Sequence, residues 1–237
     1  MVATSCLKYP LTVETESRIG LHLDSERRIT ESSGNERGPA KSTAMASALI
    51  SYLDFFWAGL RKHGQTGGIV PSQRFLIARM IAPVPTAYRG MIVELGAGAG
   101  ALTLRLAARC PAARILACEI NPILARDNHR NLTAAGIDGR VEVLADSADH
   151  VLRGISQGGR ERPDFIISGI PLGNLGKAKA GALLDTIRQT LSEGGMYIQF
   201  QHSLLDRRKI RARFPNMVST FVALNFPPAF VYYAQKR

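Results

Sequence analysis

The sequence predicts a doubly wound α/β domain whose seven-stranded sheet is mostly parallel. From residue 90 onwards, short apolar segments alternate with longer helical ones, as in parallel sheets that helices cover on both faces. A glycine-rich turn at 93–100 follows the first apolar segment. The last two apolar segments are separated by five residues, which is too short for a crossover helix, so we expect a terminal antiparallel hairpin.

Two segments of different character precede the sheet region. Residues 1–44 are rich in Ser, Thr, Glu, Arg and Gly and lack a sustained apolar period, which predicts a flexible tail. In Met45–Leu60, apolar residues recur every three or four positions, which predicts an N-terminal amphipathic helix followed by Arg61 and Lys62. Two interpretations of this helix stay open: it packs on its own domain, or its apolar face enters lipid.

After residue 44 the chain divides into a cap region, 45–89, which includes the amphipathic helix, and a sheet domain, 90–237. The cap region contains a second predicted helix, which Ser72 caps and which ends at Ile81 before two prolines. The expected strands of the sheet domain are Met91–Leu95, Arg114–Glu119, Val141–Ala145, Asp164–Ser168, Met196–Gln201, Val218–Leu224 and Phe230–Ala234. The expected helices are Leu102–Arg109, Pro122–Ala135, Ala148–Ile155 and Ala178–Leu191.

Composition and charge exclude several classes of protein. The 237 residues are 46% hydrophobic and 21% charged, which argues against disorder and fibrous architectures. There is neither an apolar run of about 18 residues nor a secretory signal at the N-terminus, and the three cysteines lack a metal-binding spacing. We therefore expect a cytoplasmic protein without a metal site. Residues 201–237 hold seven basic residues and one acidic residue, which suits a polyanionic partner, either nucleic acid or an anionic membrane.

The glycine-rich turn lies where the first strand meets the first helix. Glycines there let the backbone approach a ligand closely and leave helix N–H groups facing it. The turn also satisfies a dinucleotide fingerprint, with Glu119 nineteen residues after Gly100. The pattern by itself leaves two ligands open, a nicotinamide dinucleotide and S-adenosylmethionine (SAM).

Acidic residues near three strand ends favour SAM. Glu94 lies two residues before Gly96, at the strand tip beside the turn, where the pyrophosphate of a dinucleotide would meet a like charge. SAM instead brings an ammonium and a sulfonium, which a carboxylate stabilises. Glu119 ends the second strand, where it is placed to accept hydrogen bonds from two ribose hydroxyls. Asp146 follows the third strand, where it is placed to accept from an adenine amino group.

These motifs resemble those of the class I SAM-dependent methyltransferases. The 93–100 turn is similar to their first motif, Glu119 to the acidic residue of their second, and 145–148 to their third. The segment 191–195 is similar to their Pro-Gly-Gly turn, although Glu193 stands where the family has proline. The resemblance implies a Rossmann-like methyltransferase fold with SAM as cofactor. The cofactor-binding residues that we expect are Thr66, Gly68, Ser72, Glu94, Gly96, Ala97, Gly98, Gly100, Glu119, Ile120, Asn121, Asp146, Ser147, Ala148 and Ser168.

Within that superfamily, the chain resembles the bacterial phospholipid N-methyltransferases over about residues 50–237. The similar segments are Thr66–Ser72, Ser168–Leu172, Gln199-Phe200 and Asn225–Ala229. The resemblance implies SAM-dependent N-methylation of an aminophospholipid headgroup, with phosphatidylethanolamine as the expected acceptor. It also implies a peripheral position on the inner face of the membrane, where the partner is an anionic lipid surface; no obligate protein partner is expected. Ornithine-lipid N-methyltransferases resemble the same group, so the acceptor lipid stays open.

Ribosomal RNA adenine dimethylases use the same core and suit a basic protein, so they are the alternative. They carry Asn-x-Pro-aromatic after the fourth strand, and the aromatic ring stacks on a flipped base. Here Pro171 is kept, but Ser168 occupies the Asn region and Leu172 the aromatic position. Because leucine lacks that stacking surface, this departure favours a lipid acceptor over a nucleic-acid partner.

N-methylation requires an unprotonated amine, whereas a lysine-like amine is mostly protonated at neutral pH. Desolvation lowers such a pKa, and a nearby side chain can accept the proton. The candidate catalytic residues are Ser168, Tyr197 and His202. The basic run 206–213 is expected to contact anionic headgroups in a lipid enzyme, or phosphates in an RNA enzyme.

Overall fold

The computed structural model describes residues 73–159 and 161–237. The expected tail at 1–44, the expected helix Met45–Leu60 and the expected cap residue Ser72 lie outside the described residues. The described strands are β1 (Met91–Leu95), β2 (Arg114–Cys118), β3 (Val141–Leu144), β4 (Phe165–Ser168), β5 (Met196–Gln201), β6 (Met217–Val222) and β7 (Ala229–Gln235). The described helices are α2 (Gln73–Ile81), α3 (Ala101–Arg109), α4 (Pro122–Ala134), α5 (Ala148–Gln157), α6 (Gly176–Thr190) and α7 (Arg207–Arg213), with short 3₁₀ turns at Asp138–Arg140 and Leu172–Leu175.

The seven strands form one sheet in the order β3-β2-β1-β4-β5-β7-β6. Strands β1 to β5 pair in parallel, and β7 pairs antiparallel with both β5 and β6. This arrangement confirms the predicted mostly parallel sheet and its terminal hairpin. Of the two hairpin strands, β7 pairs with β5, so β6 is the outermost strand on that side of the sheet. Strands β1 to β6 consequently all end at one edge, which we call the carboxyl edge.

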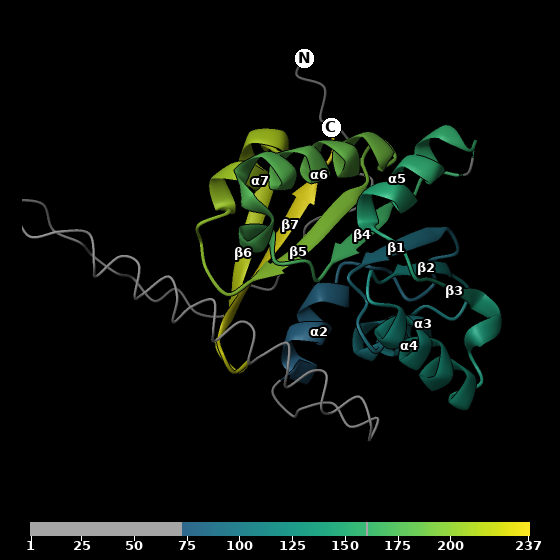
Figure 1. Ribbon diagram of the computed structural model, residues 1–237. Coiled ribbons are helices and arrows are strands. Elements are labelled where there is room, and N and C mark those ends of the chain that lie inside the picture. The colour runs from purple at the N-terminus through teal and green to yellow at the C-terminus, as the bar shows by residue number, and fades with distance from the viewer. Residues whose placement is uncertain (1–72, 160) are drawn as a thin grey trace, which may run out of the picture. The chain divides into compact units, whose positions relative to one another are not determined.

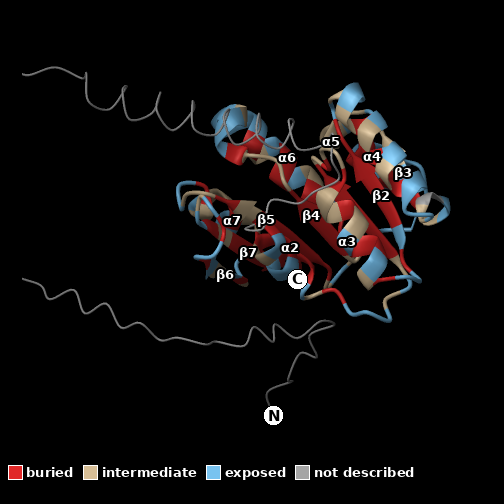
Figure 2. Cartoon of the chain, turned by 90° about the horizontal axis from the view of Figure 1, so that it is seen from below, coloured by how far each residue is buried: buried red, intermediate tan, exposed pale blue. Residues whose placement is uncertain are grey.

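Helices cover both faces of the sheet. Figure 1 shows α5, α6 and α7 on one face and α2, α3 and α4 on the other. A buried core on the first face joins sheet residues such as Val93 and Leu95 to apolar residues of α5, α6 and α7. Figure 2 shows buried residues along the strands and on the sheet-facing sides of the helices. This burial on both faces explains why the strands are nearly continuous apolar runs.

Local sequence sets several of the helix boundaries. Asn121 caps α4, because its Oδ1 accepts hydrogen bonds from the backbone N–H groups of Ile123 and Leu124, and Pro122 occupies the first turn. Ser147 caps α5 through a bond from the His150 N–H at 3.2 Å. Both caps hold turns at the carboxyl edge.

Helix α7 was not expected from the sequence. Its seven residues carry five cations, and the isoleucine Ile210 is buried against the core of the sheet. Two of the cations are paired: Arg213 donates to both carboxylate oxygens of Asp185, at 2.7 and 2.9 Å, and Lys209 Nζ lies 2.6 Å from Asp206 Oδ1. The basic run is therefore partly a structural helix and only partly a solvated cationic surface.

Candidate functional site

The glycine-rich turn joins β1 to α3 at the carboxyl edge. The N–H groups of Gly96 and Ala97 donate to the carbonyl of Cys118, at 2.9 and 3.0 Å, which fixes the turn against the end of β2. Gly98 has φ of +56°, and a Cβ at that position would meet no atom within 4 Å. The turn is therefore open on the side where Gly98 lies, as a turn that cradles a ligand must be.

Gly100 has to be glycine for a packing reason as well. Its φ is +94°, and a Cβ would lie 2.2 Å from Asn128 Oδ1. Asn128 of α4 is fully buried and donates to the hydroxyl of Thr103 at 3.2 Å. One helical turn later, Asn131 donates to the carbonyl of Ala99 at 2.9 Å. The two asparagines brace the glycine turn from behind, a role that sequence reasoning missed; their spacing of three on one helix was the available signal.

Glu119 lies directly after β2 and is 6% exposed. Its Oε2 accepts a hydrogen bond from the N–H of Gly98 at 2.9 Å, and its Oε1 accepts from the N–H of Asn121 at 2.9 Å. The carboxylate thus joins the glycine turn to the β2–α4 turn. Because an ionised carboxylate offers about four acceptor positions, it retains capacity for a ligand's hydroxyl groups.

Glu94 is the penultimate residue of β1, and its side chain is buried beneath the turn instead of standing at the strand tip. Side chains alternate along a strand, so Glu94 points away from the face of Val93 and Leu95 and toward α3. Burial raises the pKa of Glu94 to about 8; a hydrogen bond with Thr103 opposes this rise, and the charge of Glu119 adds to it. Its Oε2 has no hydrogen-bond partner among the described residues.

The remaining expected cofactor residues lie in the two neighbouring turns. Asp146 accepts from the N–H of Ser147 at 2.6 Å and pairs with the ring of His150, and these bonds lower its pKa. Ala148 begins α5, and Ile120 is 72% exposed beside Asn121 in the β2–α4 turn. All of them lie at the carboxyl edge. The expected residues Thr66, Gly68 and Ser72 lie outside the described part of the chain.

The turn at 168–172, after β4, lies directly against the glycine turn. The N–H of Gly169 donates to the carbonyl of Leu95 at 2.8 Å. A Cβ on Gly96 would lie 3.0 Å from Ile170 Cγ1, and a Cβ on Gly169 would lie 3.1 Å from the carbonyl oxygen of Gly96. The segment expected to receive the methyl acceptor is therefore in backbone contact with the segment expected to hold the donor.

Two of the three candidate catalytic residues, Ser168 and Tyr197, are fully buried and hydrogen-bonded to each other, whereas His202 is partly exposed. Ser168 is fully buried, and its Oγ accepts from the N–H of Ile170 at 3.2 Å. Tyr197 is also fully buried; it stacks on Phe214, and its hydroxyl donates to the Oε1 of Gln199. Burial raises the pKa of Tyr197 far above its ordinary value, so this placement favours a structural role over proton transfer.

His202 immediately follows β5 at the carboxyl edge. Its Nδ1 lies 3.0 Å from the carbonyl oxygen of Pro228, which can only accept, so Nδ1 carries the proton and the neutral ring has its lone pair on Nε2. Burial lowers the pKa of His202, which keeps the ring neutral at physiological pH. Of the three candidates, His202 has the protonation state that a proton acceptor requires.

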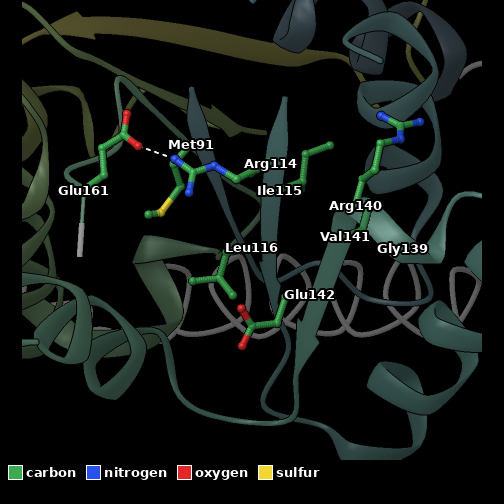
Figure 3. A pocket seen from close by; sticks show the side chains of 9 residues that line it. All are labelled: Met91, Arg114, Ile115, Leu116, Gly139, Arg140, Val141, Glu142 and Glu161. Carbon is green, nitrogen blue, oxygen red and sulfur yellow. Dashed lines mark hydrogen bonds and ion pairs between the residues drawn. The ribbon is translucent and has the colours of Figure 1, made fainter. Parts of the chain in front are cut away.

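A hollow of about 560 Å³ lies at the opposite, amino edge of the sheet. Residues at the starts of β1, β2 and β3 line it, and an ion pair between Arg114 and Glu161 borders it (Figure 3). None of the expected site residues line this hollow. It is distinct from the candidate site.

Comparisons with known proteins agree with this geometry. Residues 92–195 match a family described as a methyltransferase domain. The ornithine lipid N-methyltransferase of Singulisphaera acidiphila is 28% identical over 178 residues, which cover 73% of this chain and 91% of that protein. The crystal structure of a SAM-dependent methyltransferase from Agrobacterium tumefaciens matches 72% of this chain at 15% identity, with a TM-score of 0.58. A SAM-dependent O-methyltransferase from Thermotoga maritima matches 71% at 17% identity, with a TM-score of 0.51. The matches span 64% and 66% of those two structures.

The sheet order and the glycine turn with its buried carboxylates define an α/β enzyme domain of the Rossmann-like type. The family match places a methyltransferase domain on the same segment. Residues 92–195 form a methyltransferase domain with SAM as its cofactor, and the chain is similar in sequence to an ornithine lipid N-methyltransferase.

Proposed function

We propose that this enzyme transfers methyl groups from SAM to the amine of a membrane aminolipid. The observation that carries the proposal is a set of exposed apolar side chains on three turns of the carboxyl edge. Ile120 and Ile123 lie in or next to the β2–α4 turn, at 72% and 64% exposure. Leu205 in the β5–α7 loop is 82% exposed, and Phe226 in the β6–β7 loop is 74% exposed. Apolar side chains exposed beside a reactive edge suit a substrate embedded in a bilayer.

Hydrogen bonds join two of these turns. The His202 ring donates to the carbonyl of Pro228, and the hydroxyl of Tyr232 donates to the carbonyl of Ser203 at 3.2 Å. The β5–α7 and β6–β7 loops are thus adjacent and present their apolar residues together. Helix α7 follows the first loop directly and adds the exposed cations Arg208 and Arg211. A cation near an anionic membrane surface contributes about 1 kcal/mol to binding.

We propose that the turns of the carboxyl edge hold SAM. Three observations support the fit: the open side of Gly98, the carboxylate of Glu119 with remaining acceptor positions, and the buried Glu94 oxygen without a partner. Glu119 would accept from the ribose, Asp146 from the adenine, and Ile120 would pack against the base. When bound, SAM supplies an electrophilic methyl group on a sulfonium sulfur. The positive charge of the sulfonium and ammonium groups favours the ionised form of Glu94.

The residues of the acceptor side have separate tasks in this proposal. Contact between the 168–172 turn and the glycine turn brings acceptor and donor together, and such proximity supplies effective molarities on the order of 10⁵ M or more. His202 would accept the proton of the lipid ammonium through Nε2, directly or through water. We expect His202→Gln to lower kcat by about 10- to 100-fold with the SAM dissociation constant unchanged. An unchanged kcat would remove His202 from the mechanism.

Two acceptor lipids are supported by different observations. The resemblance to the phospholipid N-methyltransferases favours phosphatidylethanolamine, on the path to phosphatidylcholine, although the motifs themselves do not separate the two lipids. The 28%-identical relative is named for ornithine lipid. Both present a primary amine beside an anionic group. Ribosomal RNA is the contrasting acceptor, and the full burial of Leu172 leaves no side-chain surface there for a base to stack on.

The function is tested by expressing the chain in a host that makes both aminolipids and no methylated forms, followed by lipid mass spectrometry. We expect masses shifted by one, two or three methyl groups on one of the two lipids. The matched control is Glu119→Ala, which we expect to yield none. Methylated ribosomal RNA with unmodified lipids would contradict the proposal.

A further inference from the structure

Two glutamine side chains hold one carbonyl of the acceptor turn. The Nε2 atoms of Gln199 and Gln201 donate to the carbonyl oxygen of Ile170, at 3.0 and 3.3 Å. Both glutamines belong to β5 and, being two residues apart, lie on the same face of the sheet. They are 0% and 7% exposed. Because a carbonyl oxygen has two lone pairs, the two amides saturate it.

The amide of Gln199 has one orientation. Its Nε2 also donates to the carbonyl of Phe200 at 2.6 Å, so both of its protons are used. Its Oε1 accepts from the hydroxyl of Tyr197, and Tyr197 in turn stacks on Phe214 of the core. A flipped amide would direct Oε1 at two carbonyl oxygens, which is unfavourable. Tyr197 therefore orients Gln199, and Gln199 holds Ile170.

The 168–172 turn, held by the two glutamines, sets the distance between the acceptor side of the candidate site and the glycine turn. The acceptor turn contacts the glycine turn at Gly96, and added Cβ atoms there would lie only 3.0 to 3.1 Å from the facing turn, so the two backbones meet without an intervening side chain. The two glutamines oppose movement of the acceptor turn away from the glycine turn. Methyl transfer is an in-line displacement, so a displacement of about 1 Å costs on the order of 100-fold in rate.

We propose that Gln199 is a positioning residue for methyl transfer: its amide, oriented by Tyr197, keeps the 168–172 turn in register with the glycine turn. Gln199 does not itself touch the acceptor. The inference rests on the proposed function only in requiring transfer to an acceptor at this turn, whichever lipid that is. It gives Tyr197, expected from the sequence to be catalytic, a different task.

The first arm of the test does not depend on the acceptor. Hydrogen exchange of the Gly169 and Ile170 amides is measured in the wild type and in Gln199→Leu. We expect about tenfold faster exchange in the variant, with a SAM dissociation constant within about twofold of wild type. Unchanged exchange at these two amides would overturn the inference even if no lipid were methylated, whereas a wild type that methylates no aminolipid would count against the proposed function alone.

The second arm measures steady-state kinetics with the methylated lipid. Gln199→Leu is expected to lose kcat by about tenfold or more with little change in KM, and Tyr197→Phe to lose less. Gln199→Glu adds a pH dependence of kcat that a loss of stability would not produce. A carboxylate cannot donate to Ile170 but a protonated carboxyl can, so its kcat relative to wild type is expected to rise as the pH falls from about 8 to about 6.

A matched control separates positioning from stability. Thr190 of α6 is likewise fully buried, and its hydroxyl donates to the carbonyl of Thr186 at 2.9 Å, toward the amino edge. Thr190→Val is expected to lower the melting temperature without lowering kcat per folded molecule. If Gln199→Leu loses kcat only in proportion to unfolded protein, or if Gln199→Glu shows no recovery at lower pH, Gln199 is a structural residue and the inference fails.

Discussion

Charged groups at the two edges of the sheet lie in different environments. At the amino edge, charges are exposed or paired: Lys236 Nζ lies 3.0 Å from Glu193 Oε1 and donates to the carbonyl of Leu191, and this pairing lowers the pKa of Glu193. At the carboxyl edge, burial raises the pKa of Glu94 to about 8, and one of its oxygens has no partner among the described residues.

The candidate site lies at the edge that holds the buried carboxyl group, and not at the edge with the hollow. The amino-edge hollow is sizeable, yet its borders are ordinary satisfied surface groups. A buried carboxyl group with an unused acceptor atom costs folding free energy unless a ligand compensates it. We therefore identify the candidate site by its buried carboxyl group with an unpartnered oxygen and not by hollow volume.

The largest effect is expected from removing Glu119, the carboxylate that joins two turns of the carboxyl edge. We expect Glu119→Ala to reduce SAM binding below detection in calorimetry, since the variant loses both backbone bonds and the acceptor for the ribose. Circular dichroism checks that the fold is kept. Full-strength SAM binding by the folded variant would mean that the site lies elsewhere.

Glu94 tests whether burial at this edge costs stability. Its folded pKa, about 8, is above the unfolded value of 4.5, so its stabilising contribution is complete below pH 4.5 and is lost as the pH rises through 8. Each unit of pKa shift corresponds to about 1.4 kcal/mol, so the loss amounts to several kcal/mol. We expect Glu94→Gln to unfold at a higher temperature than wild type at about pH 8, and the two to converge near pH 5. Equal melting curves at both pH values would contradict the assigned burial.

A smaller effect is expected from the apolar residues of the carboxyl edge. Leu205→Ser and Phe226→Ser should each weaken sedimentation with anionic vesicles by about fivefold to tenfold, because each removes apolar surface that enters the bilayer. Val218→Ser is the matched control, since Val218 is exposed near the start of β6, toward the other edge. Equal losses in all three variants, or tight ribosomal RNA binding without vesicle binding, would argue against a membrane-facing edge.

The smallest effect is expected at the amino edge. Glu161→Gln removes an ion pair in which both side chains are more than half exposed. Such pairs contribute about 0–1 kcal/mol, so we expect the melting temperature and the SAM dissociation constant to stay close to wild type. A large loss of SAM affinity in this variant would assign function to the hollow after all.

Much of the fold was predictable because its signals are local. Apolar strands between turns gave the positions of β1 to β5 within one residue at each end, and the Asn121-Pro122 pair marked the start of α4. Helix α7 escaped prediction because its sequence is mostly cationic and Ile210 alone marks its buried face. The apolar patterns of β6 and β7 do not specify which of the two strands pairs with β5, so their order in the sheet could not be predicted.

The site was predictable to the level of residue type but not of environment. The strand-end carboxylates followed from the motif, yet the burial of Glu94 depends on Thr103 and on the alternation of β1. The resemblance singled out Gln199-Phe200, but nothing in the sequence indicated that Gln199 hydrogen-bonds to the carbonyl of Ile170. Contacts between segments distant in sequence set these properties, and no local pattern encodes them.

Proton release on SAM binding tests the central claim most directly. Calorimetric titration near pH 7, in two buffers of different ionisation enthalpy, counts the protons exchanged. Glu94, with a pKa of about 8, is protonated in most free molecules at this pH, and the bound cation favours its ionised form. We predict the release of close to one proton by the wild type and none by Glu94→Gln. Equal proton exchange in the two proteins would contradict a site built around this buried carboxyl group.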